Sequence, residues 1–137
     1  MSKSQNNAIA LSANPREIDE AVHRMFTDPD HLRASDPGRV EGNVVFTYLD
    51  AFDQDRDAVE ELKAGYRRGG LADSAVKGRL TAVLQALLAP IRERRAAVAR
   101  DPAYLLDMLR AGTAEARRVT QATLEEIRDG LGLFQLG

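Results

Sequence analysis

The N-terminal segment Met1-Ser2-Lys3-Ser4 has the residue types best suited to chemistry in this sequence. A lysine charge, two hydroxyl donors and the backbone N–H groups of a loop can together bind phosphate. Donors of this kind also stabilise negative charge on a transferring or departing phosphate. Four such residues often occur together by chance, so the phosphate hypothesis depends on the rest of the chain.

No other catalytic or metal-binding motif is present. Cysteine is absent, which excludes disulfides and thiolate nucleophiles. The only histidines, His23 and His31, lack a metal-motif arrangement of acids, so we expect surface or half-buried side chains and no metal. The acids Asp53, Asp55 and Asp57 alternate like the start of a calcium loop. The glycine and closing glutamate of that loop are missing, which indicates a solvated loop instead.

Charge is distributed unevenly along the chain. Residues 1–60 carry a net charge of −6 and residues 101–137 a net charge of −2, whereas residues 61–100 carry +6. A basic block suggests a polyanionic partner, although such blocks are often solvated helix faces, and both alternatives stay open. Six of its residues are the candidates for phosphate contacts: Arg67, Arg68, Lys77, Arg79, Arg92 and Arg94.

Apolar periodicity and cap residues predict a mainly α fold of about five or six helices, with no sheet. Asn14-Pro15-Arg16-Glu17 and Asp101-Pro102 both have the cap-plus-proline pattern of a helix start. A strand over 44–52 is the alternative to the helix predicted there. The predicted helices are 15–26, 44–52, one from Asp57 or a neighbour to Gly69, 73–100, and one from Pro102 to about Ile127, continuous or interrupted near Gly112.

Four local features accompany these helices. Residues 1–13 are expected to form a loop and then a short strand or extended segment. Pro90 removes a helical hydrogen bond and should kink its helix. Arg95 lies close to the apolar stripe, which predicts a buried or partly buried arginine paired with an acid. The apolar tail Leu131–Phe134 should pack back onto the bundle.

Several short motifs follow Met1-Ser2-Lys3-Ser4 in a definite order. They are Met25-Phe26-Thr27-Asp28-Pro29, Asp36-Pro37-Gly38, Val45-Phe46-Thr47-Tyr48-Leu49, Tyr66-Arg67-Arg68-Gly69-Gly70-Leu71, Pro90-Ile91-Arg92-Glu93-Arg94-Arg95, Gly112-Thr113 and Gly132-Leu133-Phe134. In this order and spacing the whole chain resembles the C-terminal part of bacterial tryptophanyl-tRNA synthetases, which are class I enzymes. Each motif is weak alone, and the resemblance depends on the set.

The resemblance implies an enzyme that attaches tryptophan to its tRNA with ATP and Mg²⁺. The family's Lys-Met-Ser-Lys-Ser loop binds the ATP phosphates, and Ser2, Lys3 and Ser4 match its second half. Lys3 matches the lysine that stabilises the departing pyrophosphate and would be catalytic. The loop's first lysine would precede Met1, so the chain is expected to be a part of the enzyme that is inactive alone.

The resemblance also implies a division of the chain. Residues 1–13 would be the rest of the ATP loop with its extended segment, and residues 14–137 the helical domain near the tRNA anticodon, without a complete nucleotide-binding fold. The implied partners are the tRNA for tryptophan, held by the six basic residues, the missing N-terminal catalytic half and a second subunit. The implied location is the cytoplasm, with no membrane contact. The alternatives are a freestanding RNA- or protein-binding paralogue and an inert product of gene decay.

Overall fold

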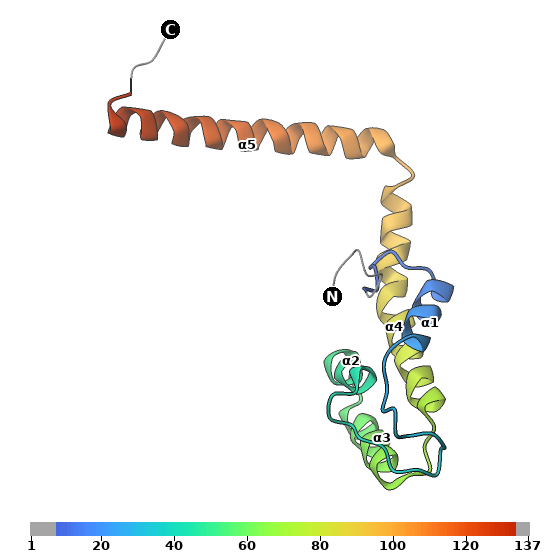
Figure 1. Ribbon diagram of the computed structural model, residues 1–137. Coiled ribbons are helices and arrows are strands. Elements are labelled where there is room, and N and C mark those ends of the chain that lie inside the picture. Colours follow the sequence, from blue (N-terminus) through green and yellow to red (C-terminus); the bar gives the residue numbers. More distant parts are fainter. Residues whose placement is uncertain (1–7, 134–137) are drawn as a thin grey trace. The chain divides into compact units, whose positions relative to one another are not determined.

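A computed structural model describes residues 8–133 and shows a mainly α protein (Figure 1). Five helices and no strand occur in that range, which confirms the predicted fold class and shows no nucleotide-binding fold there. The chain forms two compact units, Met1–Arg95 and Ala96–Gly137, which we call unit 1 and unit 2. No helix of the described range is both long and apolar enough to cross a membrane.

Helix α1 spans Pro15–His23 and begins at the predicted cap. The Asn14 side chain accepts a hydrogen bond from the Glu17 N–H at 3.0 Å, and the Glu17 carboxylate accepts one from the Asn14 N–H at 2.7 Å. The helix ends three residues before the predicted Phe26, which is 60% exposed. Before the helix, Ala13 N–H donates to the Ala10 carbonyl at 2.9 Å, so residues 8–13 contain a turn, and of the expected short strand or extended segment the strand is wrong.

Helices α2 (Val44–Phe52) and α3 (Arg56–Arg68) pack against each other. The alternative of a strand over 44–52 is therefore wrong, as the three- and four-residue spacing of apolar positions indicated. Asp55 caps α3, since its side chain accepts a hydrogen bond from the Ala58 N–H. The helix ends at Gly69, whose φ of 83° is a conformation that glycine adopts without strain.

Helix α4 spans Asp73–Val98 and supplies one side of the core of unit 1. Its buried residues recur every fourth position, which places them along one face: Val76, Leu80, Leu84 and Leu88. The helix continues through Pro90 and ends two residues before the predicted Arg100. The single long helix is thus confirmed, while the kink expected at Pro90 stays a prediction.

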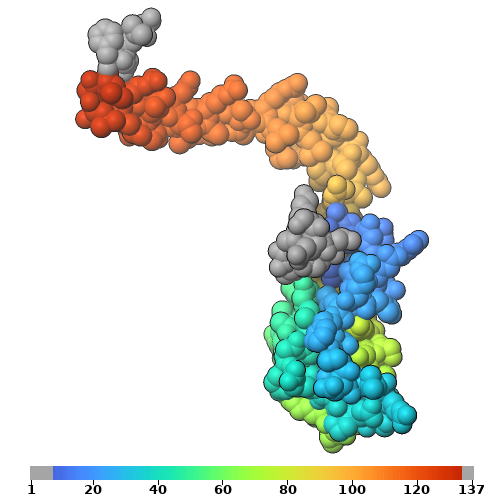
Figure 2. Space-filling model, viewed as in Figure 1, coloured from blue at the N-terminus to red at the C-terminus, as the bar shows by residue number. Residues whose placement is uncertain are grey.

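Tyr66 is the largest fully buried side chain of unit 1. Its hydroxyl donates to Asp73 at 2.7 Å, and Thr27 donates to the other oxygen of the same carboxylate at 2.6 Å. Burial of the hydroxyl raises the pKa of Tyr66, and the hydrogen bond to Asp73 raises it further. In Figure 2 the blue-to-cyan segment between α1 and α2 covers one face of this unit. The His31 ring from that segment packs on Tyr66, with 4.5 Å between the two ring centroids.

Unit 2 consists mostly of α5 (Pro102–Leu131), a single uninterrupted helix (Figure 1). Asp101 caps its start as predicted, and Gly132 ends it in the left-handed conformation. Gly112 lies inside the helix, so the alternative of an interruption there is wrong. No residue of α5 is buried. Leu133 is 55% exposed and Phe134 lies outside the described residues, so packing of the tail onto a bundle stays a prediction.

Candidate nucleic-acid interface

The phosphate-binding candidates Ser2, Lys3 and Ser4 lie outside the described residues, so their role stays a prediction. The six basic candidates all lie in unit 1. Two stand at the C-terminal end of α3, two near the start of α4 and two beyond Pro90 in the same helix. The structure therefore places them on two helices, where each can be compared by the partners that it holds.

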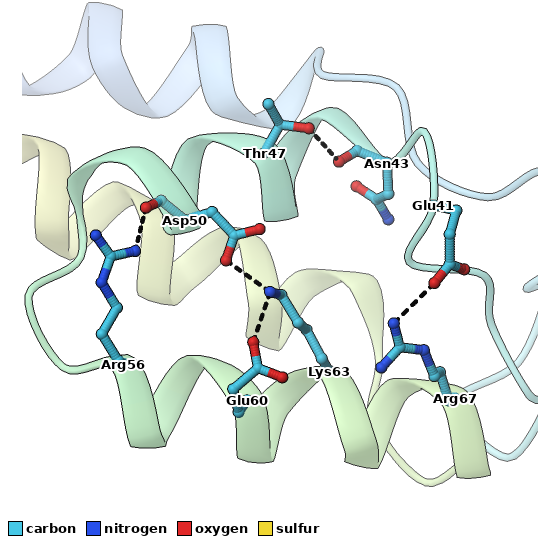
Figure 3. A network of polar contacts seen from close by, with 8 residues as sticks. All are labelled: Glu41, Asn43, Thr47, Asp50, Arg56, Glu60, Lys63 and Arg67. Atoms are coloured by element: carbon cyan, nitrogen blue, oxygen red, sulfur yellow. Dashed lines mark hydrogen bonds and ion pairs between the residues drawn. The ribbon is translucent and has the colours of Figure 1, made fainter.

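Arg67 is paired with Glu41 at 2.8 Å, at the edge of a network that joins α2 to α3 (Figure 3). In the same network Lys63 donates to Asp50 at 2.6 Å and to Glu60 at 2.7 Å. The hydrogen bond from Arg67 lowers the pKa of Glu41, and the bonds that Lys63 donates to Asp50 and Glu60 raise the pKa of Lys63. Because Arg67 and Glu41 are both largely exposed, their pairing contributes little to stability and can be exchanged for a phosphate.

Lys77 and Arg92 attach α4 to the two ends of α1. Lys77 donates to the His23 carbonyl at 2.8 Å, and Arg92 donates to the Ala13 carbonyl at 3.3 Å. Carbonyl partners leave the positive charge of each side chain uncompensated. Both residues can therefore still attract a polyanion, from positions that the fold fixes.

Arg79 forms the most buried ion pair among the described residues. Its Nε donates to Asp53 at 2.7 Å and its Nη2 to the other oxygen of that carboxylate at 3.1 Å, with Asp55 at 3.9 Å. Asp53 is 5% exposed, so the interpretation of a solvated loop is wrong for this residue. The hydrogen bond from Arg79 lowers the pKa of Asp53 despite its burial.

Arg68 and Arg94 are exposed and have no ion-pair or hydrogen-bond partner within residues 8–133. Arg95 is exposed and unpaired in the same range, so the prediction that it is a buried or partly buried structural arginine is wrong. Arg79, which is partly buried and paired with Asp53, has that role instead. Leu88 is the last buried position of α4 and Ile91 is only partly buried, so Arg95 lies beyond the part of the helix that packs on the core.

Arg68 and Arg79 are the two candidates that the structure brings together. They border a hollow of about 430 Å³ between α3, α4 and the loop that joins them. Gly65, Gly70 and Leu71 form part of its wall, and Glu61 lies at its edge. No local sequence pattern indicates this hollow, because its walls come from two helices and depend on how those helices pack.

The two histidines differ in environment. His23 is exposed, whereas His31 is 7% exposed and its Nε2 lies 3.0 Å from the Leu71 carbonyl. The expectation of a surface or half-buried side chain is therefore wrong for His31, which connects the α1–α2 segment to the α3–α4 loop. Within residues 8–133, no three His, Asp or Glu side chains form a group that could hold a metal ion.

Comparison with known proteins identifies the class of protein. A family model described as "tRNA synthetases class I (W and Y)" matches residues 1–89. The chain belongs to this family of class I tRNA synthetases. Its similarity within the family is to the tryptophan enzymes, as the following relatives show.

The chain is 47% identical over 133 residues to a tryptophan–tRNA ligase of Clostridium longisporum, and 44% identical over 135 residues to one of Lactococcus lactis. Each match covers 97% of this chain and 39% or 40% of the relative, so the chain spans about 40% of the length of these relatives. Its fold matches tryptophanyl-tRNA synthetase from Campylobacter jejuni with a TM-score of 0.80 at 26% identity, over 97% of this chain and 41% of that one. The enzyme from Giardia lamblia matches with a TM-score of 0.63 at 33% identity, over 70% and 24% of the two chains.

Proposed function

We propose that this chain takes part in the ATP-dependent attachment of tryptophan to its tRNA. The observation that carries the proposal is the 47% identity to a tryptophan–tRNA ligase over 97% of the chain. The fold supports it, since the same arrangement of helices recurs in tryptophanyl-tRNA synthetase from Campylobacter jejuni. These relatives favour the ligase over the freestanding RNA- or protein-binding paralogue.

The proposed contribution of residues 1–13 is the end of the ATP-binding loop. Ser2, Lys3 and Ser4 would donate to the phosphates of ATP, which carries Mg²⁺ as its counterion. Lys3 would stabilise the charge that develops on the departing pyrophosphate, the step where a fixed cation accelerates the reaction most. The family model covers these positions, which supports the assignment.

The proposed contribution of residues 14–137 is binding of the tRNA for tryptophan near its anticodon. Arg68 and Arg94 are the strongest phosphate ligands of the six candidates, because neither has a partner among the described residues. Lys77 and Arg92 keep their charge and would act from fixed positions. Arg67 would exchange Glu41 for phosphate, and Arg79 is the weakest candidate because Asp53 neutralises it.

The remaining parts of the proposal follow from the family. The chain would act together with an N-terminal catalytic half that holds ATP and tryptophan, in a homodimer in the cytoplasm. The 137-residue chain alone would therefore show no tryptophan-dependent exchange of pyrophosphate into ATP. Robust exchange by the purified chain would contradict this part of the proposal.

A chimera tests the function directly. The chain replaces the matching segment of the Clostridium longisporum relative, and we expect the chimera to charge tRNA with tryptophan. Lys3→Ala in the chimera should slow pyrophosphate exchange by about 100-fold, the usual cost of losing one stabiliser of transition-state charge. Arg94→Ala should leave the exchange rate unchanged and raise the KM for tRNA in the charging reaction.

The two variants act as controls for each other, since one removes a charge from the proposed ATP loop and the other from the proposed tRNA surface. Equal loss of both reactions in both variants would indicate misfolding rather than separate roles. A chimera that folds, as judged by its circular dichroism and melting, but charges no tRNA would contradict the proposed function.

A further inference from the structure

The hollow between α3 and α4 has a mixed composition that phosphate contacts do not explain. Its wall is mostly apolar, with Leu62 and Leu71 among its residues, while two arginines and the carboxylate of Glu61 border it. A site for phosphate alone needs donors and no apolar wall. An apolar surface with hydrogen-bonding groups at its edge is instead typical of a pocket for a flat, partly polar ligand.

Glycine keeps this hollow open. Gly65 lies inside α3, where glycine is less favourable than alanine. A Cβ at this position would meet only the Leu71 side chain, at an ordinary contact distance of 3.9 Å, so packing does not require the glycine. A Cβ at Gly70 would meet nothing within 4 Å. A larger side chain at position 65 would therefore extend into the hollow beside Leu71.

The arginines at its edge are suited to different contacts. Asp53 holds the Arg79 guanidinium at two points, which fixes the plane of the group. A fixed guanidinium plane provides a stacking surface for a nucleobase. Arg68 has no partner among the described residues and can contact the backbone phosphate of the same nucleotide. Glu61 can accept a hydrogen bond from an exocyclic amino group, as carboxylates do from cytosine.

We propose that this hollow binds one unstacked nucleobase of a single-stranded RNA segment, with Arg79 stacked on the base, Arg68 at its phosphate and Glu61 at an amino group. The inference builds on the proposed tRNA binding and adds a specific subsite to it. The volume of about 430 Å³ lies within the usual range of roughly 300–1,000 Å³ for small-molecule sites. A base in a duplex remains stacked on its neighbours and could not enter.

The test measures binding of the full chain to two RNAs, a tryptophan tRNA transcript and a fully paired duplex. The filling variant is Gly65→Leu, and the matched control is Gly112→Leu, which changes a helical glycine of unit 2. Gly65→Leu should weaken transcript binding at least about fivefold, the lower limit for loss of one stacked base, with duplex binding unchanged. Gly112→Leu should leave the affinity for both RNAs unchanged, and both variants should melt at or above the parent temperature.

A fluorescent base analogue gives a second readout. When 2-aminopurine replaces bases of the tRNA anticodon loop one at a time, one position should change its emission on binding to the parent chain and should not change with Gly65→Leu. Unchanged transcript affinity in Gly65→Leu, together with a weakened Arg68→Ala variant, would overturn the base pocket and leave a phosphate surface. Failure of the parent chain to bind either RNA would instead contradict the proposed function, and the pocket with it.

Discussion

Units 1 and 2 are both helical and amphipathic in sequence, yet within residues 8–133 only unit 1 contains a buried core. Ile18, Val45, Leu49 and Leu80 are all fully buried within unit 1, from three different helices. In unit 2, α5 spans Pro102–Leu131 and buries no residue. The apolar residues of a helix therefore predict the face that can be buried, whereas burial itself requires another element to cover it.

The comparison predicts unequal costs for equivalent core substitutions. Leu80→Ala removes a fully buried side chain and should lower the free energy of unfolding by about 2–5 kcal/mol. Leu109→Ala changes a side chain that is 63% exposed and should cost no more than about 0.5 kcal/mol. Urea unfolding followed by circular dichroism measures both. A cost at Leu109 equal to that at Leu80 would show that α5 is covered in solution and would break the contrast.

Glycine substitutions should have opposite signs in the two units. Gly69 has a φ of 83°, and a Cβ there would overlap the Ser35 carbonyl oxygen, so Gly69→Ala should destabilise unit 1 by roughly 1–3 kcal/mol. Gly112→Ala should stabilise α5 by about 0.5–1 kcal/mol, since no atom lies within 4 Å of the new Cβ. Thermal melts would show the two shifts. A gain in melting temperature at both positions would mean that the α3–α4 loop tolerates another conformation.

The Asp53–Arg79 pair should make the stability of unit 1 depend on pH. The hydrogen bond from Arg79 lowers the pKa of Asp53, so its contribution is complete above the ordinary aspartate pKa of about 4 and is lost as pH falls through the lower folded value. Asp53→Asn should cost about 1–3 kcal/mol at neutral pH and less at pH 3. Urea unfolding of parent and variant at both pH values tests the difference. A difference that does not change with pH would show that the charge of Asp53 is unimportant.

Arg95→Glu should change stability by less than about 0.5 kcal/mol, because Arg95 is exposed and has no partner within residues 8–133. A thermal melt beside the parent is sufficient. A large loss would restore the sequence-based interpretation of a buried arginine at this position.

These cases indicate what could be predicted from the sequence. Local signals were reliable: Asn14 and Asp101 cap the helices as expected, and Gly69 ends α3. Contacts between distant residues were not. Asp53 and Arg79 lie 26 positions apart, and no local pattern distinguishes this pair from solvated charges. The hollow beside Arg79 was unpredictable for the same reason, since it depends on how α3 and α4 pack.

The positions of the basic candidates predict that the two units also differ in tRNA binding. All six lie in unit 1, whose residues 61–95 carry a net charge of +5, while residues 96–137 of unit 2 carry −1. If unit 1 binds the tRNA, charge reversal there should weaken binding, and the same change of net charge in unit 2 should not. Long-range attraction by net charge alone would make the two changes equivalent.

A filter-binding titration of the full chain with tryptophan tRNA, repeated over a range of salt concentrations, tests the central claim most directly. With about three phosphate contacts, the log–log slope of affinity against salt should be near −2 to −3. Arg92→Glu with Arg94→Glu should weaken binding and reduce that slope, whereas Arg117→Glu with Arg128→Glu in α5 should leave the slope unchanged. Equal effects of the two double variants, or no effect of either, would contradict the assignment of tRNA binding to unit 1.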